Sequence, residues 1–149
     1  MNYKIMGRFV GKILMVEAVF MVPALFIALA RGEGDAVRGF LLSILAIVLL
    51  AGILLLLARK SNKSFYAREG LACVGLSWIV MSLMGGLPFW ISGAIPSFVD
   101  AFFETVSGFT TTGASILTAV EQMEKSLLYW RNFTNWLGGM GVLVFLLAI

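Results

Sequence analysis

The residues best suited to chemistry lie between Ser97 and Glu121, where threonines and glycines follow a short apolar stretch. The run Thr110-Thr-Thr-Gly113 offers neutral backbone oxygens, and an extended run of this kind can turn successive carbonyls the same way. Such carbonyls replace the water shell of an alkali cation without the deep trap that a carboxylate would make. The glycine permits backbone geometry that is closed to other residues. The run therefore predicts selective passage of a cation, although a threonine-rich turn between helices would show the same four residues.

The residues before this run predict a short helix over 97–108. Ser97-Phe-Val-Asp100 has the pattern of a capping box, with Ser97 as the N-cap and Asp100 at the third helical position. Apolar residues then recur at helical spacing: Phe98, Val99, Phe102, Phe103, Val106 and Phe109. Glu104 and Glu121 bracket a stretch too short to cross a bilayer. We therefore expect a re-entrant pore loop, which needs protein or water around it because its backbone is irregular at membrane depth.

The composition indicates an integral membrane protein. Of the 149 residues, 60% are hydrophobic and 13% are charged, against about 45–50% and about 25% in soluble domains. The chain has no histidine, which removes the commonest general base, and Cys73 is its single cysteine. We expect an all-α membrane protein that is not an enzyme.

Four apolar stretches are long enough to cross the bilayer. They predict helices over about 13–30, 39–58, 70–93 and 130–149, with Pro88 and Pro96 marking an irregular turn after the third. A signal peptide is the competing interpretation of the N-terminus. The first apolar run is long for a signal peptide and lacks a small-x-small cleavage site, so a retained helix is favoured.

The positions of lysine and arginine predict the orientation. Basic residues gather before the first helix and in the 59–69 loop, whereas the 31–38 loop balances Arg31 and Arg38 against Glu33 and Asp35. The 31–38 loop is therefore expected outside, and both termini in the cytoplasm.

Three other features have ordinary interpretations. Glu17, one turn past Lys12, is expected to pair with it or to reach the cytoplasmic interface. Gly138-Gly-Met-Gly141 is expected to be a small-residue surface for close helix contact. The four tryptophans are expected mostly in the membrane interface belts: Trp78, Trp90, Trp130 and Trp136.

Five motifs occur in an order that resembles the TrkH/KtrB superfamily of potassium transporters. The resemblance is to the TrkH branch in particular, because two predicted helices precede the motifs. The motifs are Arg68-Glu-Gly70, Gly86-Leu-Pro-Phe89, Asp100-Ala-Phe-Phe-Glu-Thr-Val-Ser-Gly-Phe-Thr-Thr-Thr-Gly-Ala114, Tyr129-Trp-Arg-Asn-Phe133 and Trp136-Leu-Gly-Gly-Met-Gly-Val142. The resemblance covers the whole chain.

The resemblance implies two N-terminal transmembrane helices in residues 1–68. One helix–pore loop–helix repeat of a potassium-channel-like pore would follow in 69–149, with its filter at 110–115. The filter residues would be Thr110, Thr111, Thr112, Gly113 and Ala114. K⁺ would be held through the carbonyls of Thr111 and Thr112, and next through those of Thr110 and Gly113. The family also implies a bacterial inner membrane and a cytoplasmic nucleotide-binding partner of the TrkA type.

Members of this family surround one pore with four repeats, and the present chain has one. We expect either the N-terminal part of a longer protein, which the abrupt end at Leu146-Leu-Ala-Ile149 favours, or a short homotetrameric relative. The leading hypothesis is potassium uptake through a pore of which this chain supplies one quarter of the filter. The alternative is a non-conducting assembly or regulatory subunit with the same fold.

Overall fold

The computed structural model describes residues 3–58 and 67–148, and the side chains of 67–69 and 142–148 lie outside that description. Within the described ranges the regular elements are helices alone. In chain order they are α1 (Tyr3–Arg31), α2 (Gly34–Leu57), α3 (Ala67–Gly85), α4 (Leu87–Ile91), α5 (Phe98–Phe109), the 3-10 turn η1 (Val120–Gln122) and α6 (Lys125–Ala148). The expected all-α fold is confirmed. The basic residues expected at 59–66 fall outside the described part.

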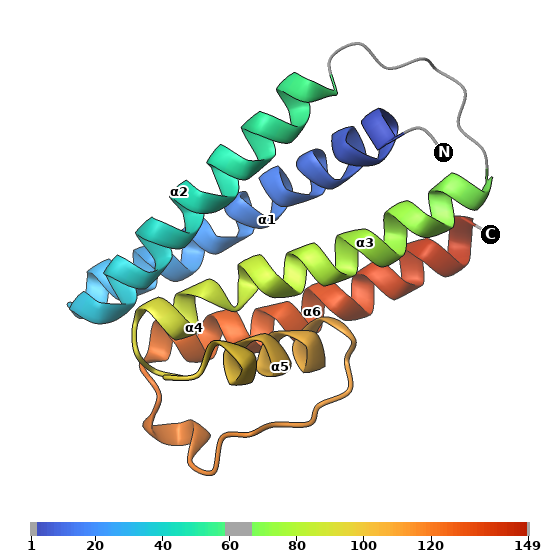
Figure 1. Cartoon of the computed structure of the whole chain (residues 1–149). Helices are drawn as coiled ribbons and strands as arrows, with labels where there is room; N and C mark the ends of the chain where they lie inside the picture. The colour runs from blue at the N-terminus through green and yellow to red at the C-terminus, as the bar shows by residue number, and fades with distance from the viewer. Residues whose placement is uncertain (1–2, 59–66, 149) are drawn as a thin grey trace.

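The long helices run up and down, so that their ends gather at two opposite ends of the bundle (Figure 1). The N-terminus, the end of α2, the start of α3 and the end of α6 lie at one end, called here the terminal end. The α1–α2 turn, α4 and the start of α6 lie at the other, called here the turn end. Three described helical stretches are long and apolar enough to cross a membrane: Tyr3–Arg31, Gly34–Leu57 and Gly70–Ile91.

Two of the expected boundaries differ from the structure. The first helix begins at Tyr3 rather than near residue 13, because hydropathy marks the apolar part of a helix and the preceding basic residues continue the same helix. The last begins at Lys125 rather than near 130, because its first turn is capped by a residue from a distant part of the chain, described below.

The predicted helix over 70–93 is divided at Gly85-Gly86 into α3 and α4. Gly86 lies against α5: a β-carbon there would be 3.2 Å from both the Ala101 carbonyl oxygen and the Thr105 hydroxyl oxygen. Pro88 fits the first turn of α4, where its missing N–H is not needed. The division therefore lets the chain pass α5 closely.

Helices α1 and α2 pack as a hairpin through small residues. Gly11 allows this approach, since a β-carbon there would lie 3.2 Å from the Ala51 carbonyl oxygen. Ala18, Ala24 and Ala28 are buried in the same helix. Small side chains let helix backbones come close, which is how helices associate where lipid supplies no hydrophobic drive.

Glu17 is the one charged side chain among the buried residues of α1. It is 1% exposed and lies midway along α1, and neither of its carboxyl oxygens has a hydrogen-bond partner. The expectation that it pairs with Lys12 or reaches the interface is wrong, because the side chain turns into the bundle.

Candidate functional site

The start of α5 is fixed by its cap. The Asp100 N–H donates to the Ser97 hydroxyl at 3.4 Å, and Ser97 has the extended backbone of an N-cap. Asp100 lies in the first turn and is exposed, so its charge faces the positive end of the helix dipole. The two predicted capping residues thus occupy the positions expected of them.

The end of α5 is a Schellman motif built from threonines. The Thr111 N–H donates to the Gly108 carbonyl, and the Thr112 N–H donates to the Ser107 carbonyl, both at 3.0 Å. Thr111 takes the left-handed position of this motif, with φ 56°. A β-branched residue is rare there, and the strain is about 1–3 kcal/mol. The expected extended strand over 110–115 is therefore wrong at its start, because its first residues close the helix.

Residues 110–115, called here the Thr-Gly segment, begin with backbone angles of alternating sign. Thr110 has φ −83°, Thr111 has φ 56° and Gly113 has φ 76°, while Thr112 between them is not among the residues with positive φ. An alternation of this kind gathers successive N–H groups on one side, and here the N–H groups of Thr111 and Thr112 are already bound to carbonyls of α5. The carbonyl oxygens of this exposed segment are therefore the backbone groups left to face an ion.

The threonine hydroxyls of this segment bind each other and α5. The Thr110 hydroxyl donates to the Val106 carbonyl at 2.7 Å and lies 2.8 Å from the Thr112 hydroxyl. Because the Thr110 proton is already committed, Thr112 is the donor of that second bond. Two of the three hydroxyls, those of Thr110 and Thr112, are thereby turned into the local structure.

Ala114 differs from the other predicted filter residues. Its carbonyl accepts a hydrogen bond from the Ser107 hydroxyl at 2.5 Å, so this oxygen is directed toward α5. Ser107 is buried on α5, and its hydroxyl ties the far end of the Thr-Gly segment back to the helix that leads into it.

A second cluster, centred on Glu104, secures the chain after the Thr-Gly segment. The buried Glu104 carboxylate accepts bonds from the Ser115 hydroxyl at 3.0 Å and the Ile116 N–H at 3.2 Å. It also forms an ion pair with the Arg131 Nε at 2.5 Å. One carboxylate thus joins α5, the end of the Thr-Gly segment and α6.

Sequence reasoning missed this cluster, because Glu104 served there only to mark one end of a stretch too short to cross the bilayer. A signal was present: an acid in an apolar re-entrant helix needs a partner, and Lys125 and Arg131 are the basic residues that follow it in this chain. Arg131 lies within a motif that was noted without a role.

A polar cavity of about 120 Å³ lies behind the Thr-Gly segment, between α5 and α6. The cavity has room for several water molecules, since each takes about 30 Å³ in the liquid. Its lining residues are Glu104, Ser107, Gly108, Gly113, Ala114, Arg131, Asn132 and Asn135. Sequence reasoning did not assign Asn132 or Asn135 to the site.

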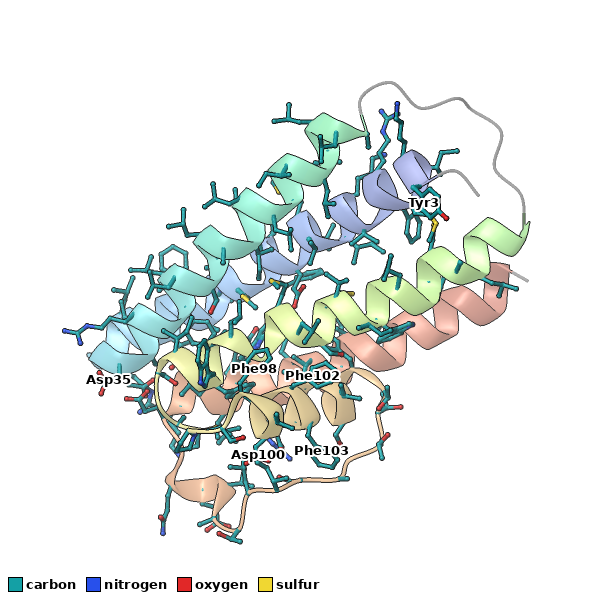
Figure 2. The ribbon with its side chains drawn as sticks, viewed as in Figure 1. Tyr3, Asp35, Phe98, Asp100, Phe102 and Phe103 are labelled. Atoms are coloured by element: carbon teal, nitrogen blue, oxygen red, sulfur yellow. The ribbon has the colours of Figure 1, made fainter. Side chains whose placement is uncertain are left out.

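Helix α5 buries polar side chains together with Ala101 and Phe109, while several of its apolar residues are exposed. Glu104, Thr105 and Ser107 are buried, whereas Val99 is 71% exposed and Phe103 is 44% exposed. Figure 2 shows Asp100 and Phe103 on the side of α5 that faces the following connection, away from the long helices. The Thr105 hydroxyl lies 2.8 Å from the Ser82 carbonyl oxygen on α3. Polar groups turn inward because an irregular segment in a membrane must be satisfied by protein.

Helix α6 supports the end of α5 from behind. Gly138 lies so close to Phe109 that a β-carbon there would be 2.7 Å from the Phe109 carbonyl carbon. The small-residue packing expected at this position is confirmed. Trp130 is fully buried and donates from Nε1 to the Gly85 carbonyl at 3.0 Å. Its expected place in an interface belt is wrong, because the bundle encloses the indole and supplies its acceptor.

At the turn end, Glu33 joins the hairpin to α6. Its carboxylate accepts from the Lys125 N–H at 3.0 Å, the Ser126 N–H at 3.1 Å and the Ser126 hydroxyl at 2.5 Å. Burial alone would raise the pKa of Glu33, but these bonds and nearby Arg31 lower it below its ordinary value. Burial, and then the Glu33 and Asp35 charges, raise the pKa of Glu124.

These features define an all-helical integral membrane protein, with an α1–α2 hairpin packed on a unit of helix, short helix, loop and helix. The chain belongs to the TrkH family, whose model, described as a cation transport protein, matches residues 37–149.

Similar proteins agree with this assignment. The Trk system potassium uptake protein TrkH of Halomonas elongata is 35% identical over 100% of this chain and 31% of its own length. TrkG of Escherichia coli K12 is 29% identical over 99% of the chain and 30% of its own length. The crystal structure of the potassium transporter TrkH from Vibrio parahaemolyticus matches with a TM-score of 0.91 and 32% identity, covering 99% of this chain and 32% of that one. The chain therefore spans about a third of the length of these relatives.

Proposed function

We propose that this chain is the N-terminal part of a protein that takes up potassium ions across the bacterial cytoplasmic membrane. The proposal draws on the relatives named as potassium uptake proteins. The observation that carries it is that Thr110 to Gly113 lie exposed and outside any helix, directly after the short helix α5, so that their carbonyl oxygens are free of a helical ladder and suited to bind a cation. In this proposal α5 is a pore helix and the Thr-Gly segment supplies one quarter of the selectivity filter.

The proposed K⁺ ligands are the carbonyls of Thr111 and Thr112, and next those of Thr110 and Gly113. The hydrogen bonds that hold the end of the Thr-Gly segment favour this assignment. Ser107 binds Ala114, and Glu104 binds Ser115, so both fix the end of the segment and leave Thr110 to Gly113 exposed in this chain. Ala114 is proposed as the residue that ends the filter, with its carbonyl held by Ser107.

Three further repeats would complete the ring. Because the chain covers 31% of the TrkH relative, we propose that they come from the rest of a longer chain, with a homotetramer as the other source. A cytoplasmic nucleotide-binding subunit of the TrkA type would regulate the assembly from its inner face.

Uptake of rubidium, a potassium congener, by cells that lack their own potassium transporters tests this proposal on the full-length protein. We expect potassium-dependent growth and rubidium uptake when the protein is expressed. Membrane insertion and stable assembly without uptake would overturn it in favour of the non-conducting subunit.

The proposed orientation puts both termini in the cytoplasm and residues 31–38 outside. Glu33 binds Lys125 and Ser126, so the α1–α2 turn and the start of α6 share one side. In intact cells carrying a Cys73→Ala background, an impermeant thiol reagent should label cysteines introduced at Gly34 and at Glu121. It should not label one at Asn62, a position outside the described residues. The reverse pattern would contradict the orientation.

A further inference from the structure

Glu17 is a buried acid that the proposed ion path does not use. It is 1% exposed, and both of its carboxyl oxygens lack a hydrogen-bond partner. The described helices already enclose it, so a partner from other parts of a longer protein would have to displace them to reach it. Burying an ionisable residue in a membrane helix costs free energy, and residues so placed are commonly functional.

The carboxyl lies where three helices meet. A β-carbon on Gly85, at the end of α3, would be 3.0 Å from the Glu17 Oε1 and 3.0 Å from the Phe109 Cε2. Phe109 is the last residue of α5 and directly precedes Thr110. The Gly85 carbonyl already accepts from Trp130. Glu17 therefore sits beside the end of α5, in a pocket that offers its oxygens no donor.

No described charged group neutralises this carboxyl. On α2, Asp35 and Arg38 pair with each other at 4.0 Å. On α5 and α6, Asp100 and Lys125 are exposed, and Glu104 pairs with Arg131. The ionisable residues described on α1 itself, other than Glu17, are exposed: Tyr3, Lys4, Arg8, Lys12 and Arg31. On α3 the charged side chains, Arg68 and Glu69, lie outside the described part, and α4 carries none.

An ionised carboxylate without donors inside protein costs several kcal/mol, whereas the neutral acid costs much less. We infer that Glu17 is a proton-binding site within the membrane, and that its bound proton keeps α1 seated against the end of α3, beside Phe109 at the end of α5. Loss of the proton would bring a charge against the Phe109 ring. Phe109 cannot yield toward α6, because Gly138 already touches its backbone. The strain would fall on the Thr-Gly segment.

The proton site is tested by infrared spectroscopy of the full-length protein in lipid vesicles at neutral pH. The wild type should show a C=O stretching band of a protonated carboxylic acid that is absent from Glu17→Gln. The matched control Glu121→Gln, which changes an exposed carboxyl, should keep the band. Identical spectra for the wild type and Glu17→Gln would overturn the proton site.

The coupling between the Glu17 proton and ion transport rests on the proposed function, and it is measured separately by rubidium uptake. Rubidium uptake by the wild type should fall several-fold as pH rises, because the neutral form is the seated one. Glu17→Gln, which is neutral at every pH, should keep its uptake over the same range. Parallel pH profiles would overturn the coupling.

Failure of the proposed function can be told apart from failure of the proton site and from failure of its coupling to transport. If the wild type transports nothing, potassium uptake fails as the function, while the infrared band still decides whether Glu17 binds a proton. If Glu17→Gln does not assemble, Glu17→Met, an apolar residue of similar length, replaces it in both measurements.

Discussion

The α1–α2 hairpin and the unit formed by α3 to α6 pack by different means. The hairpin is held mainly by small and aliphatic residues, and its buried polar side chains are Glu17 and Ser43. The second unit buries many more polar side chains: Ser77, Ser82, Glu104, Thr105, Ser107, Ser126 and Thr134. Both units are helical and apolar in composition, so hydropathy alone does not separate them.

The two units differ in buried polar side chains because only the second contains a non-helical segment, whose backbone groups lack the hydrogen bonds of a helix. In the hairpin, the Ser43 hydroxyl returns to the Gly39 carbonyl of its own helix. In the second unit, Ser77 and Thr134 likewise return to their own helices, but other polar side chains join separate parts: Glu104 binds Arg131, and Ser107 binds Ala114. A helix satisfies its own backbone in a membrane, whereas an irregular segment must be satisfied by other groups. Buried polarity therefore marks the segment suited to function.

The largest expected effect is at Gly113. Its φ of 76° is strained for any residue with a side chain, although a β-carbon there meets nothing within 4 Å in this chain. Gly113→Ser should abolish uptake or loosen the preference for K⁺ over Na⁺, while membrane insertion continues, because a side chain strains the left-handed backbone and shifts the neighbouring carbonyls of the Thr-Gly segment. The measurement is the rubidium-to-sodium uptake ratio of the full-length protein.

Gly93→Ser is the matched control for this change. Gly93 has φ 78° and equally open surroundings, but it lies in the turn after α4. Gly93→Ser should lower the stability by a similar small amount and leave the rubidium-to-sodium uptake ratio unchanged. Equal behaviour of the two variants would remove the filter assignment and the contrast between the two regions.

The next effect concerns the Glu104 cluster. Removing one partner of a buried ion pair costs roughly 3–5 kcal/mol, and Glu104→Gln should approach the lower end because the amide still accepts hydrogen bonds. We expect a lower thermal midpoint and reduced uptake, whereas Glu121→Gln, on the same connection, should change neither. A double variant with Arg131→Gln should recover part of the loss. Additive losses would show that Glu104 and Arg131 act independently.

A smaller effect on stability is expected at Glu33, which joins the α1–α2 hairpin to the start of α6. The pKa of Glu33 is lowered, so its stabilising effect is present above its ordinary value and is lost as pH falls through the lowered one. Measured in a Glu124→Gln background, the thermal midpoint should drop with acid more steeply with Glu33 than with Glu33→Gln. Because solvent screens this partly exposed carboxylate, the difference should be no more than about 1 kcal/mol at neutral pH. A gap that does not change with pH would contradict this link.

The smallest effect is expected at the start of α5. Asp100 supplies only the N–H of the cap, and its exposed carboxylate acts through the helix dipole, so Asp100→Ala should cost about 0.3–1 kcal/mol. Ser97→Ala, which removes the acceptor, should cost about 0.5–2 kcal/mol. Unfolding in denaturant measures both. A change of ion preference in Asp100→Ala would instead indicate that this residue lines the ion path.

The sequence alone determined the features that depend on neighbours along the chain. Long uncharged apolar runs predict spanning helices because a bilayer excludes charge, and the α1–α2 hairpin follows. Ser97 and Asp100 predict the start of α5 because a cap is formed within four residues. The ordered motifs were sufficient to indicate the family.

Only the tertiary structure decided how the Thr-Gly segment is held. Glu104 meets Arg131, Glu33 caps α6, and Glu17 lies beside Gly85, and each of these contacts joins residues far apart in sequence. The left-handed Thr111 could not be anticipated either, since a β-branched residue avoids that conformation unless surrounding contacts impose it. Periodicity cannot supply these contacts, because it records which residues share a face of a helix and not what that face meets.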